Sequence, residues 1–184
     1  MKITCRTGCW ETNSSSVHAI AISKKKIDMK ELASEYSVFS KLNFHHGEFG
    51  WEHELYDDVG DKASYLYQAI WDVYSPSYTN QSNESIERDK AITWLYDTLG
   101  KYGIDANFDQ KHYDEDNWRI GYIDHGTELQ EFVSKIIGNE KRLLAYLFGD
   151  SEICTSNDND DMDDITEFIK SHPKKDFEIY EKWN

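Results

Sequence analysis

The sequence lacks the features that mark exported and membrane-spanning proteins. Its first residues, MKITCRTGCWETNSS, contain no apolar segment of the kind found in signal peptides. No apolar run approaches the ~18 residues that a membrane span needs. The three cysteines are odd in number and show no paired spacing, which favours reduced thiols over a disulfide framework. These absences predict a soluble, cytoplasmic protein that does not contact membranes.

Positive charge is also scarce. The chain has 20 lysines and arginines against 35 aspartates and glutamates, a formal net charge of −15. Phosphate binding depends on cationic side chains that release counterions, so direct DNA binding is not expected. An acidic protein is instead attracted to basic surfaces, including the positive grooves of enzymes that hold nucleic acids. The alternative is that the acidity serves only solubility.

Several catalytic signatures are missing as well. The sequence contains no phosphate-binding P-loop, no dinucleotide fingerprint, no GxSxG elbow and no CxxC pair. The spacing of its histidines matches neither HExxH nor a Cys/His zinc finger. We therefore expect no cofactor and no metal.

What the sequence does contain is enough apolar and aromatic material for one core. Its 184 residues include 14% aromatics, which can supply the buried surface that the aliphatic residues do not. No linker or internal repeat stands out, so residues 1–184 are predicted to form a single domain. Strand and helix patterns mix without a regular βαβ rhythm. This predicts an α+β fold, with a mainly antiparallel sheet packed with three to five helices.

Period-2 and period-3.6 patterns place the elements. In SVHAIAIS (16–23), Val17, Ala19 and Ala21 share one face, and His18 lies on the other with the larger side chains. Residues 104–109 and 117–124 are interpreted as two paired strands around a charged loop, and 127–150 as one or two helices with a possible break at Gly138–Asn139. Further strands are expected at 2–8, 40–44, 151–156 and 175–183, and helices at 24–37, 61–74, 84–103 and 163–172.

The highest density of potentially reactive side chains lies where the chain enters the predicted strand 16–23. ETNSSSVH (11–18) places an acid, an amide, hydroxyls and an imidazole within eight residues. Ser16 and His18 would project from one strand face, so a hydroxyl could attack with His18 as acid or base while Arg6 steadies negative charge. The alternative is a polar turn whose Asn and Ser side chains bond their own backbone.

Two other stretches are rich in polar donors. HHGEFGWEHE (45–54) has enough donors for a divalent metal, but it fits an exposed loop equally well. NDNDDMDD (157–164) fails the EF-hand order at Met162, and acids at a helix N-terminus explain it more simply. This stretch and HYDEDN (112–117) could also form an acidic face aimed at a basic partner.

The string RTGCWETNSSSVHAI (6–20) resembles an N-terminal signature of small proteins from phages and mobile elements of Firmicutes. GEFGWE (47–52) and KASYLYQAI (62–70) resemble further blocks of those proteins. With its size and acidity, the chain is similar to type II-A anti-CRISPR proteins, inhibitors of the RNA-guided DNA nuclease. One such family is associated with guide-RNA truncation.

This resemblance implies a partner and a set of site residues. The partner would be the CRISPR nuclease, with bound guide RNA, in the host bacterial cell. The positions that carry the resemblance and the acidic residues of the two stretches above together form the predicted site. The residues predicted for chemistry are Arg6, Glu11, Asn13, Ser14, Ser15, Ser16 and His18, and those for binding are Glu48, Trp51, Glu52, Asp114, Glu115, Asp116, Asp160 and Asp161.

Three functions stay open at this point. A binding inhibitor would dock an acidic surface in the positive channel that holds the guide–target heteroduplex. An enzyme would truncate guide RNA held by the nuclease, although His18 has no obvious second acid–base partner except Glu11 or a distant histidine. A small phage-encoded hydrolase or nuclease acting on another nucleotide or RNA substrate is the third.

Overall fold

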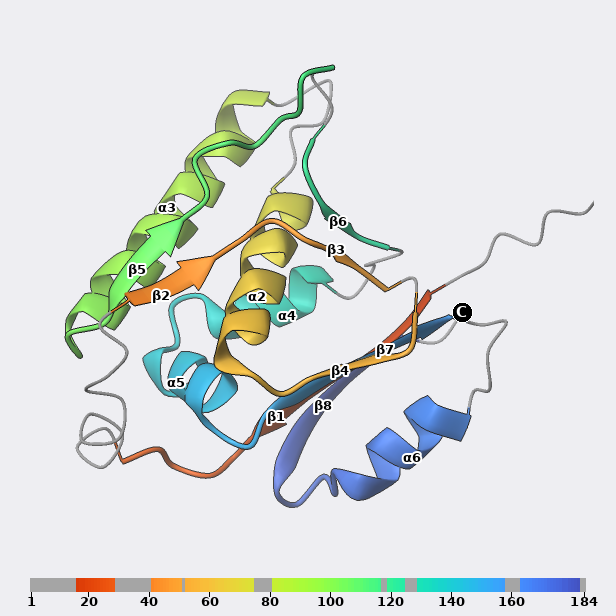
Figure 1. Ribbon diagram of the computed structural model, residues 1–184. Helices are drawn as coiled ribbons and strands as arrows, with labels where there is room; N and C mark the ends of the chain where they lie inside the picture. The colour runs from red at the N-terminus through yellow and green to blue at the C-terminus, as the bar shows by residue number, and fades with distance from the viewer. Residues whose placement is uncertain are drawn as a thin grey trace, which may run out of the picture.

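A computed structural model of the protein describes residues 16–28, 41–50, 52–74, 81–116, 119–124, 129–157 and 163–182. At its centre lies a four-stranded antiparallel sheet in the order β4-β7-β1-β8 (Figure 1). The strands are β1 (Ser16–Ser23), β4 (Glu54–Tyr56), β7 (Glu152–Asn157) and β8 (Phe177–Lys182).

Two short parallel pairs stand apart from this sheet. Strand β2 (Lys41–Phe44) pairs with β5 (Asp105–Phe108), and β3 (Glu48–Phe49) pairs with β6 (Tyr122–Ile123). The predicted pairing of 104–109 with 117–124 is therefore wrong. Each of these strands pairs instead, in parallel, with a strand from residues 41–49. In the first pair the Phe44 and Phe108 rings stack with centroids 4.6 Å apart.

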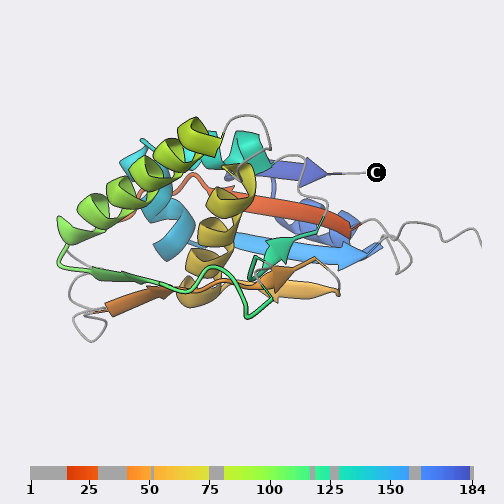
Figure 2. The same cartoon turned by 90° about the horizontal axis from the view of Figure 1, so that it is seen from above.

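Five helices are described, and they cover both faces of the central sheet. Helices α2 (Val59–Val73), α4 (Leu129–Ile136) and α5 (Glu140–Phe148) lie over one face, and α6 (Asp163–Ser171) lies over the other (Figure 2). Helix α3 (Gln81–Gly100) runs along β5 on the outside. Asp58 caps α2 by accepting a hydrogen bond from the Gly60 backbone at 2.7 Å.

The alternation in β1 divides the core into two parts. Val17, Ala19 and Ala21 pack against Ile165 and Phe168 of α6. The opposite face carries Ile20 and Ile22 into the larger core around α2, which also contains Tyr65, Leu66, Phe132 and Tyr146. The face that the sequence assigned to His18 is thus the face of the main core.

Most predicted elements are confirmed. The helix break is real: Gly138, with a φ of +82°, separates α4 from α5. The first two aspartates of α6 occupy its first turn, as expected for acids at a helix N-terminus. The α+β fold class is confirmed. The strand predicted at 2–8 and most of the helix predicted at 24–37 lie outside the described residues. No helix in the described ranges has both the length and the apolar character needed to cross a membrane.

Candidate functional site

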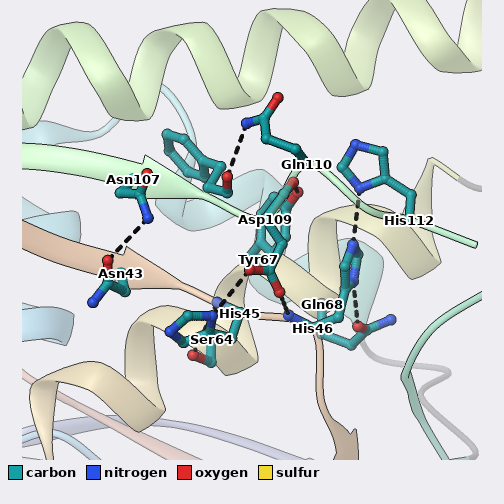
Figure 3. A network of polar contacts seen from close by, with 11 residues as sticks. Asn43, His45, His46, Ser64, Tyr67, Gln68, Asn107, Asp109, Gln110 and His112 are labelled. Carbon is teal, nitrogen blue, oxygen red and sulfur yellow. Dashed lines mark hydrogen bonds and ion pairs between the residues drawn. The ribbon is translucent and has the colours of Figure 1, made fainter.

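The parallel pair β2–β5 brings together polar residues that are distant in sequence. Phe44 lies opposite Phe108 in the register, so both strands end at the same edge. The Asp109 backbone N–H continues the ladder by donating to the Phe44 carbonyl at 3.1 Å. His45 and His46 therefore leave β2 beside Asp109, which leaves β5 (Figure 3). Side chains that follow parallel strands at one edge commonly form sites in α/β structures, and here they form a connected polar network.

Asp109 holds both histidines. Its Oδ1 lies 3.0 Å from His45 Nδ1, and its Oδ2 accepts from the His46 backbone N–H at 2.9 Å. Burial alone would raise the pKa of Asp109, but these hydrogen bonds outweigh it and leave the pKa below its usual value. The ionised carboxylate thus fixes the His45 ring through Nδ1. This leaves His45 Nε2 with no hydrogen-bond partner in the described part of the chain.

A second chain of hydrogen bonds assigns the tautomer of His46. Gln68 donates from Nε2 to Asp72 at 3.0 Å, so its Oε1 is the atom that faces His46 Nδ1 at 2.9 Å. His46 must then carry its proton on Nδ1 and present a lone pair at Nε2. His112 Nδ1 donates to that lone pair at 3.1 Å. In neutral His112 the Nε2 atom is consequently free to accept a proton.

Asp72 holds the buried end of this chain of hydrogen bonds, which runs through Gln68 and His46 to His112 and which we call the relay. It accepts from the Ile123 backbone N–H at 2.7 Å and pairs with Arg119 at 2.6 Å. Burial raises the pKa of Asp72, although Arg119 and the hydrogen bonds from Ile123 and Gln68 act in the other direction. Arg119 also donates to the Trp71 carbonyl at 3.3 Å, which links the Asp72–Arg119 pair to helix α2.

Trp71 supports the exposed end of the relay. His112 stacks on its ring with centroids 4.3 Å apart, and the Arg88 guanidinium lies 3.9 Å from the ring centroid. Burial, followed by the nearby His46 and Arg88, lowers the pKa of His112. His112 is therefore neutral near pH 7, which is the state a general base needs.

His45 lines a cavity of about 550 Å³ between β2 and the start of α2. Ser64 lies on the same cavity and accepts a hydrogen bond from the His45 backbone N–H at 3.2 Å. Lys41 and Asn43 from β2 also line it, above apolar side chains such as Val59 and Phe148. A substrate in this cavity would contact the His45 imidazole, which Asp109 orients, together with positively and negatively charged side chains.

His18, the histidine that the sequence predicted for acid–base chemistry, has a different environment. It is 6% exposed. Its Nε2 donates to the Asp124 carbonyl at 2.9 Å, and the buried Tyr65 hydroxyl donates to its Nδ1 at 3.2 Å. Both ring nitrogens are thus occupied by protein groups, which ties β1 to α2 and to the end of β6. Of the other residues predicted for chemistry, Ser16 is the first residue of β1 and its backbone pairs with Asn157.

The predicted binding residues that can be placed all lie on the surface. Glu48 in β3 and Glu52 after it are exposed, and so are the acids of the charged loop before β6. That loop contains Asp114, Glu115 and Asp116, with Asp114 accepting from the Asp116 backbone at 3.0 Å. The remaining predicted residues lie outside the described ranges: Arg6, Glu11, Asn13, Ser14, Ser15, Trp51, Asp160 and Asp161.

The donors of residues 45–54 do not converge on one point. His45 turns to Asp109 and His46 to Gln68, whereas His53 lies 3.5 Å from Asp164 in α6. Within the described residues, no group of three or more His, Cys, Asp or Glu side chains is placed to hold a metal ion. Cys154 is buried in β7, and burial raises the pKa of its thiol to about 12, so it is not an activated nucleophile.

Sequence reasoning missed Gln68, Asp72, Asp109 and Arg119, and it treated His112 only as part of an acidic loop. A usable signal was present, since His45–His46 and Asp109 each directly follow a short strand. That signal needs the parallel pairing of the two strands, which the sequence did not indicate. Comparison with known proteins finds no matching family model, no similar curated protein and no similar solved structure.

Proposed function

We propose that this protein is an inhibitor of the type II RNA-guided DNA nuclease that acts in the host cytoplasm on the nuclease–guide RNA complex and truncates the guide RNA. The resemblance of residues 6–20 to anti-CRISPR proteins supports the choice of partner. The observation that carries the chemistry is the network of His45, His46, Asp109 and His112, which offers two imidazole nitrogens without partners among the described residues. It supplies an acid and a base without His18, whose two nitrogens are already bonded.

The proposed reaction is cleavage of an RNA phosphodiester by its own 2′-hydroxyl. His112 Nε2 removes the 2′-hydroxyl proton, and the 2′-oxygen attacks the adjacent phosphorus. The bond from phosphorus to the 5′-oxygen breaks, and protonated His45 donates a proton to that oxygen. Asp109 orients the His45 ring and can stabilise its positive charge. The products are a 2′,3′-cyclic phosphate and a free 5′-hydroxyl, so atoms and charge balance.

The test is incubation with end-labelled guide RNA, with and without the nuclease. The wild-type protein is run beside His45→Ala and His112→Ala. We expect truncation with the wild type, loss with either variant, and unchanged truncation with His53→Ala, an exposed histidine outside the network. The shortened RNA should carry a cyclic phosphate. Truncation that survives in both network variants would overturn this site.

A second candidate function is inhibition by binding alone, which one surface feature favours. Glu54, Asp57, Asp58 and Asp61 lie together where β4 leads into α2. Burial and then the charges of Asp58, Asp57 and Glu54 raise the pKa of Asp61. None of the four forms a salt bridge with a lysine or arginine among the described residues. A basic groove on a partner would relieve this repulsion.

Charge reversal separates the two functions. Asp57→Lys with Asp61→Lys should slow association with the nuclease and weaken its salt dependence, if the acidic patch makes the contact. Glu131→Lys with Glu167→Lys makes the same change in net charge at exposed positions of α4 and α6. Equal effects from both pairs would show that only overall charge matters. Inhibition with intact guide RNA would favour binding alone.

A further inference from the structure

Five cationic side chains of this acidic chain line a cavity of about 950 Å³. The cavity lies between the segment that follows β1 and the first turns of α5. Its cationic lining consists of Lys24, Lys25, Lys26, Lys141 and Arg142, and we call it the basic cavity. A volume of this size suits a ligand of nucleotide dimensions.

Three carboxylates line the basic cavity, Asp28, Glu140 and Glu178, and the last two form ion pairs. Glu140 receives Lys101 at 2.7 Å and the Tyr102 hydroxyl at 2.5 Å, and these contacts lower the pKa of Glu140. Glu178 pairs with Arg142 at 2.6 Å and also accepts from the Tyr180 hydroxyl at 2.6 Å. Glu178 therefore neutralises Arg142 of the same lining, whereas Glu140 is paired with Lys101 outside it. The four lysines outnumber the one remaining carboxylate, Asp28, so the lining stays positive.

The lysines are correspondingly available. Lys26 and Lys141 are exposed and form no ion pair among the described residues. Lys25 lies 3.7 Å from Asp150, but both side chains are more than 70% exposed, so water screens that pair. Lys24 donates to the Lys174 carbonyl, which leaves its charge unbalanced. The first N–H groups of α5 add a positive dipole at the same edge.

The floor of the cavity is apolar. Ile22, Leu144 and Ala145, all core residues, form part of its lining. A cationic rim above an apolar floor fits a ligand with a phosphate and a flat apolar body better than it fits an inorganic anion. We propose that the basic cavity binds single-stranded RNA, with lysines on the phosphates and a base against the floor. The choice of RNA rests on the proposed function, whereas the phosphate-ester chemistry rests on the cavity itself.

The test measures binding of a short fluorescent single-stranded RNA to the whole protein, without the nuclease, over a range of salt concentrations. His112→Ala is present in every sample so that cleavage does not interfere. We expect affinity to fall with salt, with a log–log slope of about −0.7 for each phosphate contacted. Lys26→Glu with Lys141→Glu should lower affinity at least tenfold and reduce the slope by about 1.4.

The matched control is Lys135→Glu with Lys170→Glu, two exposed lysines outside the cavity that make the same change in net charge. It should lower affinity much less. Equal losses from the two pairs, or no binding of RNA at low salt, would overturn the proposal. Full displacement of the RNA by inorganic phosphate at equal concentration would also overturn it, because the apolar floor would then contribute nothing. Failure of guide-RNA truncation alone leaves this measurement intact, so the two proposals can fail separately.

Discussion

His18 and His112 are both imidazoles in polar stretches of the sequence, yet the structure surrounds them in opposite ways. His18 lies in a central strand with each nitrogen bonded to a buried protein group. His112 lies in a surface loop, with one nitrogen bonded to His46 and the other without a partner in the described ranges. The first arrangement stabilises the junction of β1 with α2, and the second leaves an atom available for chemistry.

The comparison shows that local polar density is a poor guide to reactivity. An imidazole can take part in acid–base chemistry only if a nitrogen can reach the substrate. The residues around His18 are rich in hydroxyls, but the alternation of β1 points its ring into the core. The acids that follow His112 at positions 114–116 are exposed, but its ring turns toward Trp71 and His46.

The largest expected effect is on activity at His112. If the proposed function holds, His112→Ala should slow guide-RNA truncation by about 100- to 10,000-fold, because it removes the general base. The same variant should change the free energy of unfolding by less than about 1 kcal/mol, since the side chain is only partly buried. Truncation rates and urea unfolding check both parts. A stability loss large enough to account for the lost activity would remove the distinction from His18.

His18→Ala should show the opposite pattern. The change leaves the Tyr65 hydroxyl and the Asp124 carbonyl without their observed partner and opens a cavity beside α2. We expect a loss of about 2–4 kcal/mol in the free energy of unfolding. At a temperature where the variant is folded, truncation should continue. Denaturant unfolding beside His45→Ala, which is exposed and should lose little stability, provides the reference.

Gly121→Ala should damage the relay from a distance. Gly121 has a φ of +71°, and an added Cβ would lie 2.6 Å from Gln68 Oε1 and 2.6 Å from the Gly47 carbonyl. We expect a cost of about 1–3 kcal/mol from the backbone conformation, with a further cost from these contacts. Gly103→Ala is the control, because its φ is +76° but nothing lies within 4 Å of the added Cβ. Only Gly121→Ala should also slow truncation, through displacement of Gln68.

The smallest effect is a pH dependence of stability at His112. Because the pKa of His112 is lowered in the folded state, the unfolded chain binds more protons in this range. The contribution of His112 is therefore full above its unfolded pKa of about 6.5 and is lost as the pH falls through the folded pKa. Chemical unfolding of the wild type and of His112→Asn from pH 8 to pH 5 measures it. Curves that stay parallel would contradict the lowered pKa. Asp109, whose pKa is also lowered, stabilises the fold fully above its unfolded pKa of about 3.9 and loses that contribution only as the pH falls further, outside this range.

The sequence determined much of the fold through local patterns. Alternation predicted β1 and its two faces, the period of helical patterns located α2, α3 and α6, and Gly138 marked the break between α4 and α5. These features depend on side chains within a few residues of one another, and such patterns can be read directly along the chain.

Only the tertiary structure decided where acid–base chemistry can occur. His45 and His46 meet Asp109, and His112 joins them through His46, because β2 and β5 pair in parallel across about 60 residues, as the register of Lys41 with Asp105 shows. No local pattern encodes that pairing, since it depends on how both strands pack against α2 and α3. The sequence alone could show that His18 lies on the side of β1 with the larger residues. The fold was needed to show that this side is the core and that both of its nitrogens are already bonded.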